Sequence, residues 1–150
     1  MRRIFAYLME NGYRPALEDS CMLLQANDNS FVLEHHDNIL TLRTFYAIEK
    51  DEYDLFLEAS NMSMLDSFMI KPVIMDEGES LMFSCETFCV TFSDFKRFFP
   101  MMMEYMGKGI DAHKHYMKEL LGMTELLGGK MPVSNEQVIR TGTMRSKLLS

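Results

Sequence analysis

The sequence lacks tryptophan, has only three cysteines among its 150 residues, and contains no long apolar run. An odd number of cysteines argues against a disulfide framework and favours reduced thiols, as in the cytosol. No stretch approaches the roughly 18 apolar residues of a membrane span. The apolar part of the N-terminus, residues 4–9, is shorter than the roughly 7–15 residues of a cleavable signal peptide. We therefore expect a cytoplasmic protein that does not contact membranes.

Positive charge is also scarce. The chain has 15 Lys and Arg against 22 Asp and Glu, which gives a net charge of −7. Residues 1–100 hold 8 basic and 17 acidic side chains, whereas residues 101–150 hold 7 and 5. Nucleic acids and anionic lipids are bound through cationic contacts. The charge therefore argues against both as partners.

Methionine, in contrast, is abundant, with 16 residues in the chain. Its unbranched, polarizable side chain fills irregular gaps and adapts to varied partners. Most of these methionines fall on helix or strand periods, where they would be ordinary core residues. The length suits one domain with a real core.

The pattern along the chain predicts an α+β domain in the order α-β-β-β-α-β-β-α, with helices packed against an antiparallel sheet of about five strands. Helices are expected over 3–11, 51–60 and 93–121, strands over 20–26, 31–36, 39–48, 67–76 and 81–92, and turns at 27–30, 37–38 and 76–79. We expect residues 1–122 to form the single domain and 123–150 to be a flexible or loosely packed tail.

Two strands carry a local irregularity. Pro72 cannot donate a ladder hydrogen bond, so it predicts an edge or a bulge. The apolar parity of 81–92 switches within the strand, which predicts a bulge near Glu86 and Thr87.

In the helix over 51–60, Asp51 is the expected N-cap. The expected inner face of that helix consists of Tyr53, Phe56, Leu57 and Ser60.

The last helix carries an amphipathic stripe that predicts its core-facing side. The stripe consists of Phe95, Phe98, Phe99, Met102, Met106, Ile110, His113, Met117, Leu120 and Leu121. Ser93 is the expected cap, and Pro100 should kink the helix. Met101, Met103 and Tyr105 lie off the stripe and widen the apolar surface. These three residues are either buried on several sides within one domain or exposed at an interface.

The histidines do not form a metal-binding pattern. His35 and His36 are strand neighbours that point to opposite faces, and His113 and His115 lie about 200° apart on a helix, so neither pair chelates well. We expect no metal and no cofactor.

The sequence also offers no catalytic pattern. Cys85 and Cys89 lack an identifiable base and are interpreted as small buried residues. The Gly107-Lys108-Gly109 segment lies within a helix, without the strand-before-helix context of a phosphate loop. We expect no catalytic residues.

Three stretches, together with the element order, carry a resemblance: FVLEHHDNILTLRTFY (31–46), LEASNMSMLDSFMIKPVIMDEGESLMFSCET (57–87) and FSDFKRFFPMMMEYM (92–106). They resemble the YbjN family, also named bacterial sensory transduction regulators, which shares its α+β fold with the type III secretion chaperones. The resemblance covers roughly residues 3–121; Pro100 and the tail past 122 depart from it. It implies a one-layer sheet with helices against it, commonly a homodimer, that acts by binding other proteins. It supplies no catalytic residues.

We therefore expect a non-enzymatic bacterial cytoplasmic protein-binding module, regulatory or chaperone-like, that acts through an apolar helix or sheet surface. Its partners would be other proteins, and it would form a homodimer. The candidate partner-binding residues are Met101, Met103 and Tyr105, together with their neighbours Met102 and Met106.

Two alternatives stay open. One is a small-molecule-binding or enzymatic domain with a pocket between the sheet and the last helix, where His113, Cys85 and Glu86 would supply polar groups. The other is a protein that forms a homodimer through the long helix and binds no client.

Overall fold

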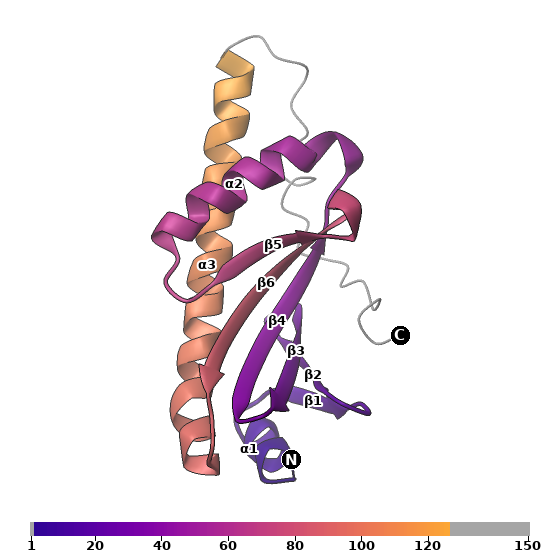
Figure 1. Ribbon diagram of the computed structural model, residues 1–150, viewed down its shortest axis with the longest axis vertical. Helices are drawn as coiled ribbons and strands as arrows, with labels where there is room; N and C mark the ends of the chain where they lie inside the picture. Colours follow the sequence, from indigo (N-terminus) through magenta and orange to yellow (C-terminus); the bar gives the residue numbers. More distant parts are fainter. Residues whose placement is uncertain (1, 127–150) are drawn as a thin grey trace.

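The computed structural model describes residues 2–126, with one antiparallel sheet and helices packed against it (Figure 1). The strands are β1 (Arg14–Leu17), β2 (Met22–Ala26), β3 (Asn29–His36), β4 (Ile39–Ala47), β5 (Lys71–Met75) and β6 (Ser80–Phe88). The helices are α1 (Arg2–Glu10), α2 (Tyr53–Asp66) and α3 (Phe92–Leu126), with 3₁₀ turns η1 (Lys50–Glu52) and η2 (Asp76–Gly78). The strand order is β1-β2-β3-β4-β6-β5. The predicted α+β class is confirmed.

Two-residue turns close the hairpins on either side of β3. Asn27 and Asp28 have φ of 49° and 62°, and Asp37 and Asn38 have φ of 49° and 63°. Asn and Asp tolerate this left-handed conformation, which matches the twist of the flanking strands. The turn at 37–38 is where the sequence predicts it, whereas the turn predicted over 27–30 is shorter, because Asn29 and Ser30 pair with β2 as part of β3. The two turns fix the registers of β2 with β3 and of β3 with β4.

The sheet has six strands where about five were expected, because β1 was missed. Its four residues pair with β2 at one edge of the sheet, and most of their side chains are exposed. So short an exposed strand has no apolar alternation to reveal it. The opposite edge is β5, so the edge position expected from Pro72 is confirmed.

The predicted bulge near Glu86 and Thr87 is wrong. The two residues pair in continuous register with Thr41 and Leu40 on β4. The parity switch has another cause: β6 ends at Phe88, and the chain then leaves the sheet. Phe88 is 75% exposed, so it does not continue the inward pattern.

One face of the sheet and the helices share the main core. Figure 1 shows α3 running beside the sheet, with α2 crossing α3 next to β5. The largest fully buried side chains there are Leu8, Met22, Leu24, Leu40, Leu42, Leu81, Phe83, Phe95, Phe99, Met102, Met106 and Met117. A smaller cluster on the other face contains strand and loop residues only: Cys21, Val32 and Phe45, packed by Leu23, Met75 and Met82. The core therefore lies between one sheet face and the long helix.

The second helical segment differs from its prediction. Asp51 lies within η1, and Glu49 occupies the N-cap position of that turn. The helix α2 extends to Asp66, beyond the expected end at residue 60. Phe56 and Ser60 are buried as expected, but Tyr53 and Leu57 are exposed. The helix packs against α3 as well as against the sheet edge, so its inward side is rotated from the expected one and consists of Phe56, Ala59, Ser60 and Ser63.

The last helix, α3, has 35 residues and continues through Pro100 without a break. Thr91, not Ser93, caps it: the Asp94 backbone N–H donates to Thr91 Oγ1 at 3.1 Å, and the Thr91 N–H donates to Asp94 Oδ2 at 2.8 Å. This reciprocal pair satisfies otherwise orphaned helix-end donors. The predicted tail lies outside the described residues from residue 127 onward.

Candidate functional site

The five candidate partner-binding residues divide between the core and the surface. Met102 and Met106 are 2% and 0% exposed and belong to the main core, so they offer no surface in this structure. Met103 and Tyr105 are half-buried and pack against that core. Met101 is 44% exposed. The off-stripe residues are therefore the ones that reach the surface, and partner binding itself stays a prediction.

An exposed aromatic ring adjoins this part of α3. Phe68, in the segment between α2 and β5, is 73% exposed, and its ring centroid lies 6.1 Å from that of Tyr105. Met101 lies one helical turn before Tyr105, on the same side of α3. We call Phe68, Met101 and Tyr105 the Phe68 patch. Two segments far apart in the sequence contribute to it.

Sequence reasoning missed Phe68 because no local signal reveals the exposure of a loop residue. The stretch before β5 was interpreted as strand, which would have given Phe68 a place in the sheet. In the structure the strand starts only at Lys71. The segment is held against α3 by Ile70, which is buried, and this leaves Phe68 over the ring of Tyr105. Its role follows from tertiary placement alone.

The three polar groups of the alternative site do not converge. Cys85 lies on the helix-covered face of β6, whereas its neighbour Glu86 points to the other face and is exposed. His113 is buried on α3, with Ser60 Oγ 3.3 Å from its Nε2 and the rings of Phe56 and Phe83 beside it. Glu86 is thus separated from the other two by the sheet.

Burial also removes the reactivity of these groups. Burial lowers the pKa of His113 to about 4, against a smaller opposing effect of a hydrogen bond with the Phe56 backbone. Burial raises the pKa of Cys85 to about 11. At neutral pH the imidazole is therefore uncharged and the thiol protonated. Both are chemically passive core groups.

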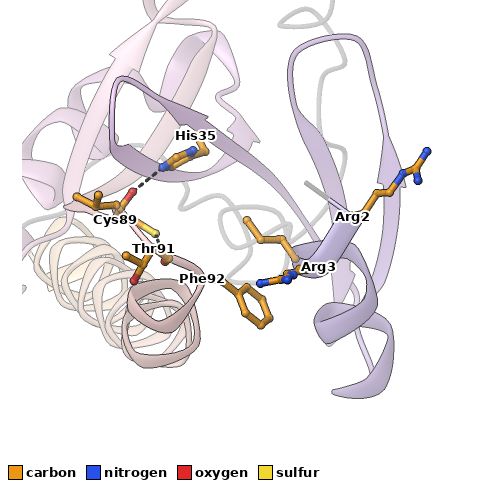
Figure 2. Close-up of a pocket in the computed structure, with 8 residues that line it drawn as sticks. Arg2, Arg3, His35, Cys89, Thr91 and Phe92 are labelled. Carbon is orange, nitrogen blue, oxygen red and sulfur yellow. Dashed lines mark hydrogen bonds between the residues drawn. The ribbon is translucent and has the colours of Figure 1, made fainter.

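A shallow hollow of about 390 Å³ lies where α1 meets the start of α3 (Figure 2). His35 forms one wall, and its Nε2 lies 2.6 Å from the carbonyl oxygen of Cys89. Figure 2 shows Arg3 beside Phe92, while Arg2 points away from the hollow. Burial raises the pKa of the Cys89 thiol, so it offers no nucleophile there. A second hollow, of about 490 Å³, is also bordered by His35 and is lined by the paired Glu34 and Arg43.

Within residues 2–126, no group of three or more His, Cys, Asp or Glu side chains is placed to hold a metal ion. Over the same part of the chain, no helix combines the length and the apolarity that crossing a membrane requires.

Comparison with known proteins finds similarity at the level of structure. No family model and no curated protein matches the sequence. The fold is similar to a solved structure described as "Crystal structure of YbjN, a putative transcription regulator from E. coli", with a TM-score of 0.60. The match has 14% sequence identity and covers 76% of this chain and 91% of the other. This similarity shows a shared fold.

Proposed function

We propose that this protein is a non-enzymatic binding module for other proteins, regulatory or chaperone-like, and that the Phe68 patch is its contact surface. The observation that carries the proposal is the exposed ring of Phe68 beside Met101 and Tyr105 on α3. Burying a large apolar side chain contributes about 1.5–3 kcal/mol. Aromatic anchors of this kind dominate the energetics of protein interfaces.

The surrounding chemistry supports binding over catalysis. Phe68 and Met101 are apolar, and burial holds two core side chains, Cys85 and His113, in their uncharged forms at neutral pH. The shared fold with YbjN, described as a regulator, is compatible with a non-enzymatic role. Methionine adapts its shape to different partners, which suits a chaperone-like surface.

Site-specific photo-crosslinking in cells tests the proposal. A photoreactive amino acid is placed at position 68 or 101 of the full-length chain, with Lys118 as the control because it is exposed on another side of α3. We expect one discrete adduct with a second protein from positions 68 and 101 and none from 118. In the same experiment, Phe68→Ser should abolish the adduct from position 101.

Two other outcomes would contradict the proposal in different ways. Adducts only with the chain itself would identify the patch as a self-association surface and favour homodimerisation without a client. Equal labelling from all three positions would mean that the patch has no specific partner. Circular dichroism of each variant checks that the fold is retained.

A further inference from the structure

We propose that the partner of the Phe68 patch carries acidic residues at both ends of an apolar helical segment about three turns long. This inference rests on the proposed function and specifies its partner. Residues 2–91 hold 6 basic and 16 acidic side chains, whereas residues 92–126 hold 5 of each. Residues 92–126, which contain Met101 and Tyr105, are therefore neutral, whereas residues 2–91, which contain Phe68, are acidic.

Two exposed cations flank the patch along α3. Arg97, Met101, Tyr105 and Lys108 follow each other at steps of four, four and three residues, so they share one side of the helix. Arg97 precedes the apolar pair and Lys108 follows it. The two cations are eleven positions apart, which is about 16 Å along the axis at 1.5 Å per residue. A partner helix of about three turns spans this distance.

Both cations lie close to aromatic rings on the same helix. The Arg97 guanidinium carbon is 5.3 Å from the centroid of Phe98, and Lys108 Nζ is 5.5 Å from the centroid of Tyr105. Such contacts hold a cation beside the apolar surface. A carboxylate that meets either cation is thereby placed at the border of the patch.

The existing partners of these cations do not prevent such a contact. Lys108 Nζ lies 2.6 Å from Glu104 Oε1, with both side chains 64% exposed. Arg97 lies near Asp94, whose pKa it helps to lower, although hydrogen bonds from Thr91 act more strongly there. Exposed ion pairs contribute little, so an incoming carboxylate can share or replace Glu104.

The test uses two synthetic helical peptides of about 14 residues, long enough for the 16 Å span. Both carry the same leucines and phenylalanine on one side; one has glutamates at both ends and the other has lysines. Binding of each labelled peptide to the full-length protein is measured by fluorescence anisotropy. We expect the glutamate peptide to bind about fivefold to tenfold more tightly than the lysine peptide.

Charge-reversal variants make the test specific. Arg97→Glu combined with Lys108→Glu should abolish or invert the preference of the protein for the glutamate peptide over the lysine peptide. Arg14→Glu combined with Lys118→Glu makes the same change in net charge at exposed positions away from the patch, and it should preserve the preference. Equal binding of the two peptides, absence of glutamate-peptide binding, or an equal loss in both double variants would overturn the inference.

The Phe68→Ser variant separates failure of this inference from failure of the proposed function. If the two peptides bind the unchanged protein equally and Phe68→Ser weakens the binding of both, the patch is the binding surface and the predicted preference for an acidic partner is wrong. If Phe68→Ser changes neither affinity although the peptides bind, the patch itself is wrong. Raising the salt concentration should narrow the difference between the peptides, because exposed charges are screened.

Discussion

Gly109 lies directly against Ile70. A Cβ atom at Gly109 would be 2.7 Å from Ile70 Cγ2 and 2.9 Å from Ile70 Cβ. Because Gly109 has no side chain, the segment before β5 can lie against α3. Phe68, two residues before Ile70, is thereby placed beside the ring of Tyr105. The glycine costs helix stability, but it sets the geometry of the Phe68 patch.

Gly109→Ala should destabilise the protein by about 1–3 kcal/mol, because the clash with buried Ile70 outweighs the gain in helix propensity. Gly107 provides a matched control in the same helix, since nothing lies within 4 Å of a Cβ there. Gly107→Ala should instead stabilise by about 0.5–1 kcal/mol. Urea unfolding followed by circular dichroism measures both. A stabilising Gly109→Ala would show that Ile70 can move aside.

Gly78, in the turn between β5 and β6, and Gly12, between α1 and β1, form a second matched pair of glycines. Gly78 has φ of +95°, and a Cβ there would be 2.6 Å from the ring of Tyr53, whereas Gly12 has φ of +83° with no atom within 4 Å. Alanine at either position suffers a left-handed backbone penalty of about 1–2 kcal/mol. Gly78→Ala should cost more than Gly12→Ala in thermal unfolding. Adding Tyr53→Ala should remove the extra loss caused by Gly78→Ala; if it does not, the clash is not its source.

His113 should make stability depend on pH. Its folded-state pKa of about 4 lies below its ordinary value of 6.5, so the unfolded chain takes up the proton more readily. The contribution of neutral His113 to the free energy of unfolding is fully present above pH 6.5, and it is lost as the pH falls from 6.5 to about 4. The shift corresponds to about 3 kcal/mol at 1.36 kcal/mol per pH unit.

The measurement is the free energy of unfolding in urea between pH 7 and pH 4. His113→Gln should lower stability at pH 7 and flatten this pH dependence. His115→Gln is the control, because His115 is exposed beside Glu119. A slope that is unchanged in His113→Gln would mean that other groups cause the acid sensitivity.

The three cysteines should be unreactive in the folded protein. Cys21, Cys85 and Cys89 are each at most 3% exposed. Burial raises the pKa of Cys85 to about 11 and also raises the pKa of the other two thiols. Because the thiolate is the reactive species, a thiol reagent such as Ellman's reagent should react slowly in buffer and with all three in urea. Rapid reaction of one thiol in buffer would show that it is accessible and ionised.

The elements predicted best were those whose signals are local. The Asp37-Asn38 turn follows from two residue types that accept positive φ, and the α3 stripe follows from regular spacing. The failures depend on tertiary structure. Phe88 looked like a continuing strand residue because the sequence does not mark where β6 leaves the sheet. Phe68 became part of the candidate site only because Ile70 and Gly109 hold its segment against α3.

The position of α3 in the chain has a consequence for synthesis on the ribosome. The helix-facing side of the sheet comes from residues before Phe92, yet α3 supplies much of its cover. Until those 35 residues emerge, a nascent chain exposes the apolar sheet face that includes Leu40, Leu42 and Phe83. Partly made chains expose the surfaces from which aggregation starts. Completion of the core is therefore a late event, and it depends on the last element described in the structure.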